Sequence, residues 1–493
     1  MRIPERFLEI IPGTMVWITL VVAFLASLFF PLAAVMFILL FDLYWLFRVL
    51  YFLPYLILSW KNYHAALQKD WAHACASHPG FERIYHLIFL PTYQEEIGVI
   101  RETLRTLARS SFPANRMIIV LAGEARDAER FRAISMNLTR EFEHVFFALW
   151  VTEHPSDLPD EIPGKGSNLN YSGKTIFPEI QKTGIPIDDI IVSSFDVDTI
   201  VHPQYFSCLG YTYLTTPEPT RASYQPVPLY NNNVWESPAV VRVAMFGTTF
   251  WLMTELARPE GMMTFSSHSM SLRMLTDVGF WQKDIVSEDS RIFLQALTYY
   301  HGDYRVIPLY LPVSMDTVMT GNYRAALIAL YKQQRRWAWG VENFPYMVRA
   351  FASDRIMPLR VKAAFLWKQI EGMYTWATAP FLITVMGYLP FWLAPQSVRE
   401  ATLFQNTPFT LQWLMRGAMI GAILSAGMAW SLLPARPKQI AAWKSPIVTV
   451  LQWVLLPVTF VLFGAFPAID AQTRFMLGKK LGFNVSPKRK SSE

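Results

Sequence analysis

Two aspartates that are separated by one residue carry the strongest chemical signal in the chain. Asp196 and Asp198 follow directly after the apolar run 190–195. In an extended chain, residues two apart point to the same side, so the two carboxylates converge. Converging carboxylates need a cation to neutralise them, and Mg²⁺ or Mn²⁺ prefers such oxygen ligands and often holds substrate phosphates as well. The pattern indicates a divalent-cation site, although a surface turn with two acidic residues would show the same letters.

Two further segments fit a phosphorylated ligand. The residues Pro91-Thr92-Tyr93-Gln94-Glu95 follow the apolar run 86–90 and precede a helix expected over 95–110. Polar groups at such a place lie near a helix N-terminus, where anions are favoured. Lys165 lies in the segment 164–170, which we expect to be a flexible loop that presents an ammonium group to a diphosphate. A solvated loop lysine is the alternative.

Two motifs later in the chain add an acid and an acceptor site. Ser287-Glu288-Asp289 precedes a helix expected over 290–300, and the alternative to a catalytic role is an N-cap for that helix. The set Gln333, Arg336 and Trp337 offers phosphate pairing by Arg and a flat stacking face for a sugar by Trp. The alternative is that these side chains snorkel at a membrane interface.

The elements that must position these residues belong to a region of mixed polarity over residues 61–353. Apolar runs at 86–90, 117–121 and 190–195 alternate with helical stretches. Alternating strands and helices predict an α/β domain with a mainly parallel central sheet, and ligands bind at the carboxyl ends of such strands. The motifs Pro91–Glu95 and Asp196–Asp198 both stand at predicted strand ends.

Long apolar segments flank this domain on both sides. Hydrophobic residues make up 52% of the 493 residues and charged residues only 17%, where about 25% charged is typical of soluble proteins. A membrane-spanning helix needs about 20 apolar residues. The sequence therefore predicts two spans within 1–60, an amphipathic interfacial helix at 354–371, about three membrane segments within 372–467 (near 372–394, 411–433 and 446–467), and a basic tail at 468–493.

Composition also excludes some classes of protein. The net charge of +6 comes from basic residues spread over loops and gathered in the C-terminal tail, which fits contact with membrane lipids rather than with nucleic acid. Two cysteines, Cys75 and Cys208, rule out a disulfide scaffold. A cleaved signal peptide is not favoured, because no small-residue cleavage site precedes the next apolar run. A transporter or scaffold is a remote alternative, since only Asp42 and Arg48 fall clearly within a predicted span.

Taken in order, these motifs resemble those of a known family. The chain resembles the membrane-integrated family 2 glycosyltransferases of the GT-A fold, which include cellulose, chitin and hyaluronan synthases. The resemblance rests on Pro91-Thr92-Tyr93, Asp196-Val197-Asp198, Ser287-Glu288-Asp289 and Gln333-x-x-Arg336-Trp337 between flanking spans. One departure stands after strand 117–121, where the family usually has an aspartate that contacts the nucleotide base. Here the segment reads Leu121-Ala122-Gly123-Glu124, so Glu124 is the first candidate for that role and Asp127 the weaker one.

The resemblance implies an inverting, metal-dependent transfer of a sugar from a nucleotide sugar, with a UDP-sugar as the first choice. It implies that Asp289 is the general base and that Asp196 and Asp198 hold Mg²⁺ or Mn²⁺. The nucleotide sugar would bind to Pro91, Thr92, Tyr93, Glu95, Glu124, Lys165 and Asp196, and the acceptor or diphosphate to Glu288, Gln333, Arg336 and Trp337. His268 is expected to be structural rather than a metal ligand.

The expected acceptor is a growing polysaccharide or a glycolipid, and the alternative is single-sugar transfer to a polyprenyl-phosphate or another lipid carrier. The expected location is the cell membrane, with several spans and a cytoplasmic catalytic domain. Protein partners are not indicated by the sequence.

Overall fold

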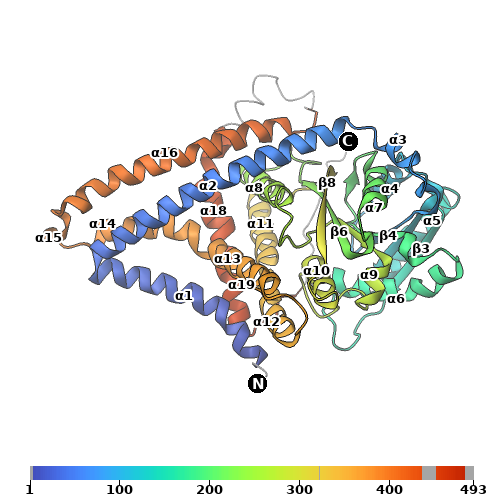
Figure 1. Ribbon diagram of the computed structural model, residues 1–493, viewed down its shortest axis with the longest axis horizontal. Helices are drawn as coiled ribbons and strands as arrows, with labels where there is room; N and C mark the ends of the chain where they lie inside the picture. The colour runs from blue at the N-terminus through green and yellow to red at the C-terminus, as the bar shows by residue number, and fades with distance from the viewer. Residues whose placement is uncertain (1–3, 321, 436–450, 483–493) are drawn as a thin grey trace.

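The computed structural model describes residues 4–320, 322–435 and 451–482. The molecule is elongated, with an α/β domain at one end and a group of long helices at the other (Figure 1). Residues 483–493 of the expected basic tail lie outside the described residues, as does the start of the segment expected near 446–467. The first part of that expected tail instead belongs to a helix, α19 (Phe466–Met476).

A mixed sheet of mainly parallel strands forms the centre of the α/β domain. In the described part of the chain the strand order is β3-β2-β1-β4-β7-β6-β8-β5. The strands β3, β2, β1 and β4 are parallel to one another, β7 is antiparallel to both β4 and β6, β8 is parallel to β6, and β5 is antiparallel to β8. Their bounds are β1 (Tyr85–Pro91), β2 (Met117–Glu124), β3 (Ala148–His154), β4 (Ile190–Ser194), β5 (Ile200–Val201), β6 (Ala222–Leu229), β7 (His268–Ser271) and β8 (Arg305–Ser314). The predicted mainly parallel sheet is confirmed.

Helices cover both faces of this sheet, which explains the uninterrupted apolar runs in its strands. Alternate residues of β1 point to opposite sides, so Leu87 and Phe89 join one core cluster while Ile88 and Leu90 join the other. The first cluster includes residues of α6 (Lys165–Lys182), α8 (Ala239–Leu256), α9 (Leu272–Asp277) and α10 (Glu288–Tyr299). The second includes residues of α3 (Trp71–Ala76), α4 (Ile97–Ala108), α5 (Ala128–Phe142) and α7 (Tyr205–Thr215).

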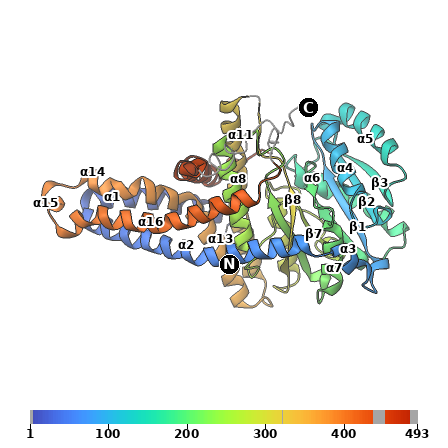
Figure 2. The ribbon, with the colours of Figure 1, turned by 90° about the horizontal axis from the view of Figure 1, so that it is seen from above.

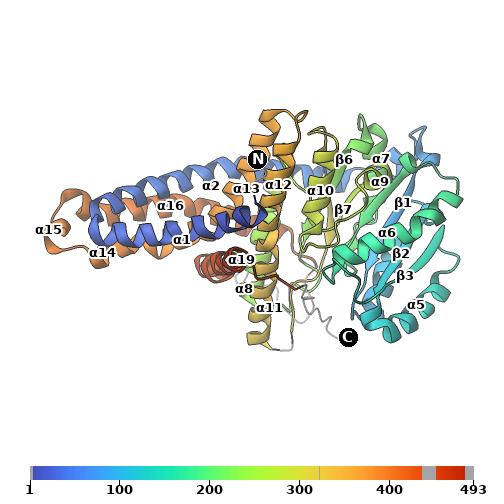
Figure 3. The same ribbon diagram turned by 90° about the horizontal axis from the view of Figure 1, so that it is seen from below.

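Long helices from both ends of the chain form the other end of the molecule. They are α1 (Glu5–Phe29), α2 (Pro31–Gln68), α13 (Leu359–Thr384), α14 (Leu389–Leu393), α15 (Gln396–Arg399), α16 (Thr402–Ser431), α18 (Leu456–Phe460) and α19 (Phe466–Met476). Helix α16 runs along α2 (Figures 1 and 3), and Gly417 and Gly421 face Leu46 and Val49 across the contact. Three elements connect this group to the sheet domain: α11 (Tyr323–Ala338), the 3-10 turn η6 (Trp339–Glu342) and α12 (Asn343–Ser353). The view in Figure 2 places α8 and α11 between the sheet and the long helices.

Several helices are long and apolar enough to cross a membrane. Among the described residues these are Glu5–Phe29, Pro31–Gln68, Ala239–Leu256 and Gln452–Met476, and a bent pair Leu359–Thr384 and Met386–Leu393 also qualifies if it counts as one span. Helix α8 (Ala239–Leu256) belongs to the predicted sheet domain, and two thirds of its apolar window is buried inside the protein. Its apolarity therefore reflects packing on β6 and α2.

Two details differ from the sequence expectation. The interfacial helix expected at 354–371 and the span expected at 372–394 share the continuous helix α13, because the charges at its start do not interrupt helical hydrogen bonding. Helix α16, which contains the span expected at 411–433, is not among the helices apolar enough to cross.

Candidate active site

The carboxyl ends of β1 and β2 form one wall of the candidate site. The Thr92 amide donates a hydrogen bond to the Ala122 carbonyl (2.8 Å), which continues the pairing of these strands past Pro91. The chain then turns sharply at Gln94, whose φ is 66°. The Gln94 amide donates to Asp127 (3.1 Å), so the turn is fixed to the segment after β2.

Tyr93 and Glu124 lie together at this wall. The guanidinium of Arg126 lies 4.5 Å from the centre of the Tyr93 ring and pairs with Glu124, with 2.8 Å between Arg126 Nε and Glu124 Oε2. Glu95 accepts a hydrogen bond from the Tyr93 amide (2.6 Å). Pro91, Thr92, Tyr93, Glu95 and Glu124 all line one large cavity. Asp127 is not among its lining residues, so of these two candidates Glu124, the last residue of β2, is the one that lines the cavity.

Asp196 and Asp198 lie in a turn that follows β4. The Thr199 amide donates to the Asp196 carbonyl (2.9 Å), so the segment is not extended, contrary to the expectation from the sequence. Both carboxylates nevertheless line the cavity. Asp196 accepts a hydrogen bond from Ser266 (2.8 Å), and Asp198, which is 2% exposed, accepts one from the Asp316 amide (3.0 Å).

Lys165 joins the separate carboxylates into one cluster. Its Nζ lies 3.0 Å from Asp196 Oδ1, 3.0 Å from Asp289 Oδ1 and 3.6 Å from Glu288 Oε1. The prediction of a flexible loop around Lys165 is wrong, because Lys165 is the first residue of α6 and is only 8% exposed. A Cβ at the next residue, Gly166, would lie 3.1 Å from the Glu288 Cβ. Glycine at that position therefore lets α6 approach α10 closely.

Burial and charge act in opposite directions on this cluster. Burial by itself lowers the pKa of Lys165, but the charges of Asp196, Asp289 and Glu288 outweigh it and raise that pKa well above its usual range. Burial and the neighbouring Asp289 raise the pKa of Glu288 to about 8. The ammonium of Lys165 offsets this only in part, because it is 3.6 Å from Glu288 but within hydrogen-bond distance of the two aspartates.

Asp289 stands in the first turn of α10, and its carbonyl accepts a hydrogen bond from Thr264 (2.5 Å). Ser287 precedes that helix, but its side chain makes no capping hydrogen bond and donates instead to Glu342 (2.7 Å). The N-cap alternative for Ser287 is therefore not what the structure shows. His268 is fully buried in β7, donates from Nδ1 to the Phe265 carbonyl (2.8 Å), and burial lowers its pKa to about 4.

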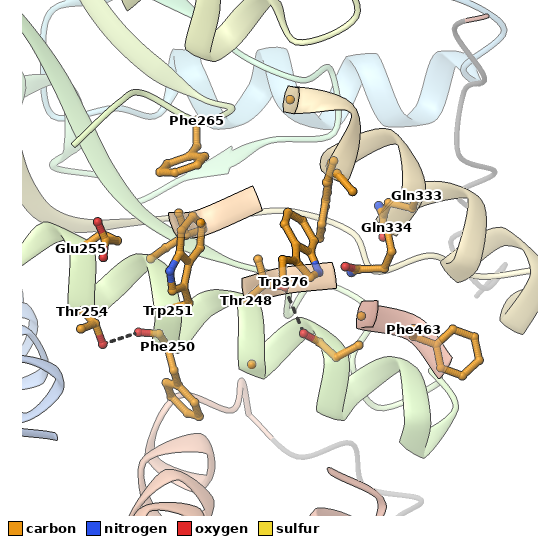
Figure 4. A pocket seen from close by; sticks show the side chains of 18 of the residues that line it. Thr248, Phe250, Trp251, Thr254, Glu255, Phe265, Gln333, Gln334, Trp376 and Phe463 are labelled. Atoms are coloured by element: carbon orange, nitrogen blue, oxygen red, sulfur yellow. Dashed lines mark hydrogen bonds between the residues drawn. The ribbon is translucent and has the colours of Figure 1, made fainter. Parts of the chain in front are cut away.

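The cavity has a volume of about 1830 Å³ and continues from the carboxylates to the long helices. Gln333, Arg336 and Trp337 of α11 line it, and the Trp337 ring lies 5.7 Å from that of Tyr230. Figure 4 shows the part of the cavity with Trp251 and Phe265, whose ring centres are 5.1 Å apart, together with Gln333, Trp376 and Phe463. Sites for drug-sized ligands usually measure about 300–1,000 Å³. This cavity therefore has room for more than a single small ligand.

Sequence reasoning missed several residues that complete the site. Asp316 follows β8, lines the cavity and accepts a hydrogen bond from Asn232 (3.0 Å). The signal was present, because an aspartate follows the apolar run 305–313 much as Asp196 follows 190–195. Thr264 and Ser266, which hold Asp289 and Asp196, have no distinguishing sequence pattern. Within the described residues, no group of three or more His, Cys, Asp or Glu side chains is arranged to hold a metal ion.

The mainly parallel sheet, with helices on both faces and acidic residues at the carboxyl ends of its strands, is a GT-A-like fold. Residues 191–466, more than half of the chain, match the family described as Glycosyl transferase family group 2. The chain belongs to this family and is a glycosyltransferase. The matched region contains Asp196, Asp198, Asp289 and the Gln333–Trp337 motif.

Some solved glycosyltransferases are similar to this chain. The mannosyltransferase PcManGT from Pyrobaculum calidifontis, in complex with GDP-Man and Mn²⁺, is 13% identical, with a TM-score of 0.45 over 78% of this chain and 98% of that chain. TarS 1-349 from S. aureus, in complex with UDP, is 12% identical, with a TM-score of 0.36 over 73% of this chain and 95% of that chain. Comparison with curated proteins finds no match.

Removing the ammonium of Lys165 should destabilise the protein. In Lys165→Met, the carboxylates of Asp196 and Asp289 lose a buried partner, and breaking a buried ion pair in this way costs about 3–5 kcal/mol. Thermal unfolding in detergent measures this loss of stability. The control is Lys182→Met on the same helix, whose exposed pair with Glu179 contributes little. Equal melting temperatures for the two variants would contradict the assignment.

Glu288 should make the stability depend on pH. Its pKa is about 8 in the folded protein and 4.5 ordinarily, so the folded state binds the proton more tightly. Stability is then lost as the pH rises from about 4.5 to about 8. We expect the melting temperature of the wild type to fall across this window relative to that of Glu288→Gln, which cannot titrate there. If the difference in melting temperature between the wild type and Glu288→Gln stays constant from pH 5 to pH 8.5, the pKa of Glu288 is not raised.

Proposed function

We propose that this glycosyltransferase moves a sugar, with inversion, from a nucleotide sugar to a growing glycan or a glycolipid at the membrane. The observation that carries the proposal is the continuity of one cavity from Asp196, Asp198 and Asp289 to the long apolar helices α2, α13 and α16. A sugar donor bound only in the sheet domain would not need a cavity that extends to these helices. An acceptor substrate that grows, or that is attached to a lipid, would need that extension.

The proposed reaction needs one base. An acceptor hydroxyl attacks the anomeric carbon while the bond from that carbon to the diphosphate breaks, and Asp289 takes the hydroxyl proton. The new bond forms on the face opposite to the leaving diphosphate, which gives inversion. Lys165 holds Asp289 by two contacts of 3.0 and 3.2 Å, and its positive charge is also available to the leaving diphosphate. The wall at Tyr93 and Glu124 would hold the nucleotide.

The residues present fit a divalent cation. Asp196 and Asp198 both line the cavity, and hard ions such as Mg²⁺ and Mn²⁺ prefer carboxylate oxygens, with phosphate oxygens completing the shell. Glu288, Asp289, Lys165 and Arg336 also line this cavity. In our proposal Asp198 and Asp196 would hold the ion, which neutralises charge on the diphosphate when bound.

On the acceptor side, Trp337 and Tyr230 form a pair of aromatic faces suited to a sugar ring. Gln333 and Arg336 lie on the same helix and line the cavity. Gln333 is buried, and its Oε1 has no hydrogen-bond partner among the described residues. A buried oxygen without a hydrogen-bond partner costs free energy. A hydroxyl group of the acceptor substrate would donate a hydrogen bond to this oxygen.

We place the protein in the cell membrane, with several spans and the catalytic domain in the cytoplasm. The apolar helices support the membrane setting, and the cytoplasm is where nucleotide sugars would be available to the sheet domain. Single-sugar transfer to a lipid carrier is the second candidate, favoured by the largely apolar side chains of the cavity near α16 and α18. A product ladder from radiolabelled donor separates the two, since a carrier transferase gives one discrete lipid-soluble product.

Replacing the base should stop transfer without stopping donor binding. In Asp289→Asn the shape of the side chain is kept, but the amide cannot accept the hydroxyl proton. We expect the rate of transfer to fall by about 10²–10⁴-fold, with nucleotide affinity nearly unchanged. Initial rates and a nucleotide titration measure the two effects. Wild-type turnover in this variant would exclude Asp289 as the base.

The donor is identified by release of nucleoside diphosphate. Purified protein in nanodiscs, with Mg²⁺ or Mn²⁺, is given UDP-, GDP- and other nucleotide sugars in turn, and we expect release from a UDP-sugar. The signal should vanish with EDTA and in Asp198→Ala, because the leaving diphosphate then lacks its cation. Release that persists in both controls would contradict metal dependence, and release from a GDP-sugar alone would correct the nucleotide.

A further inference from the structure

The segment that follows the Gln333–Trp337 motif packs against the start of the helix that carries Asp289. Glu342, the last residue of η6, places its Oε1 within 2.9 Å of the Val286 amide, 2.7 Å of the Ser287 amide and 2.7 Å of the Ser287 hydroxyl. Its Oε2 accepts a hydrogen bond from Trp339 Nε1 (3.0 Å). Four donors therefore meet one carboxylate. Three of them belong to Val286 and Ser287, which stand three and two residues before Asp289.

The next residue, Asn343, contacts the chain on the other side of Asp289. Its Oδ1 accepts a hydrogen bond from Arg291 Nε (2.8 Å), and its Nδ2 donates to the Ser290 hydroxyl (2.8 Å). Arg291 also donates to the Glu342 carbonyl (3.1 Å) and to Gln282 (2.6 Å). Arg291 and Asn343 are both buried. The residues on either side of the base are thus held by two consecutive side chains.

Glu342 holds the residues that precede the helix. The Ser287 side chain makes no capping hydrogen bond to α10. The amides of Val286 and Ser287, which stand before the first helical residue Glu288, bond to Glu342, which comes from a segment about 55 residues later in the chain. Hydrogen bonds to a charged group are stronger than neutral ones, so the carboxylate holds the loop before Asp289 more firmly than an amide would.

The same segment carries the acceptor-side residues. Helix α11, with Gln333, Arg336 and Trp337, runs directly into η6 and then into α12 without an intervening loop. Glu342 itself does not line the cavity, whereas Val286, Ser287 and Asp289 do. Glu342 can therefore act on the reaction only through the residues that it holds.

We propose that Glu342, assisted by Asn343, is a positioning residue that sets the base Asp289 relative to the acceptor-side residues of α11. This inference rests on the proposed function, because it assigns a role within that reaction. It means that the short connection through Glu342 and Asn343, in addition to the contacts of Asp289 with Lys165 and Thr264, sets the distance between base and acceptor.

The kinetic test is Glu342→Gln. The amide has one acceptor oxygen, so when that oxygen faces Ser287 the NH₂ group faces the Trp339 N–H, and the two donors repel. Displacement of the base by about 1 Å costs on the order of 10²-fold in rate. We expect kcat for transfer to fall about 10–100-fold, with the KM for donor and the affinity for nucleoside diphosphate within about twofold of wild type. The matched control is Glu141→Gln, an exposed carboxylate on α5 that pairs with Arg101 and is remote from the cavity.

An unchanged kcat in Glu342→Gln, or a parallel loss of kcat, donor affinity and melting temperature, would overturn the proposal. A purely structural role gives the second result, because it would not separate kcat from KM.

A second measurement does not depend on activity. Hydrogen exchange of peptides that cover residues 282–291 reports the amides of Val286 and Ser287, which lose their acceptor in Glu342→Ala. We expect exchange there to speed up by about tenfold or more, with no change in Glu141→Ala. Unchanged exchange would overturn the proposal even if the enzyme is active. Faster exchange in Glu342→Ala, combined with no release of nucleoside diphosphate from any nucleotide sugar by the wild type, would count against the proposed function. The contact of Glu342 with Val286 and Ser287 would still be established.

Discussion

The ammonium group of Lys165 lies among carboxylates from two other parts of the chain, and the site is built around that charge. Asp196 comes from the turn after β4, Glu288 and Asp289 come from the start of α10, and Lys165 is the first residue of α6. Carboxylates at such distances repel one another in a buried site unless a cation lies between them. The close approach of α6 to α10, which Gly166 permits, places the lysine where it can meet this requirement.

Charged side chains also stand beside opposite charges where the cavity passes the long helices. Arg48 of α2 lies opposite Glu371 of α13, and Arg258 and Lys368 both pair with the buried Glu255 at the end of α8. These charged side chains have ionic partners, and all of them also line the cavity.

Two kinds of connection tie the sheet domain to these helices. One is helical continuity, since α11 leads through η6 into α12 and then to α13. The other is electrostatic, since Arg335 of α11 pairs with Asp470 of α19 (2.8 Å), which also pairs with Arg474 (2.6 Å). Helix α11 is therefore linked through Glu342 of η6 to the residues before Asp289, and through Arg335 to the C-terminal helix α19. A change in the position of α19 would reach the acceptor-side residues through Arg335.

The sequence by itself determined the family, the mainly parallel sheet and the set of motifs, because local apolar runs and short acidic motifs depend on neighbouring residues alone. Tertiary structure decided how those motifs meet. The sequence predicts a loop lysine at Lys165, because the carboxylates that surround it come from distant parts of the chain. Thr264, Ser266 and Glu342 carry no local signal that separates them from ordinary polar residues, and Asp316 shows only the apolar run that precedes it. Their roles arise from contacts between residues 25 to 124 positions apart, which chain folding, and not local pattern, brings within hydrogen-bond distance.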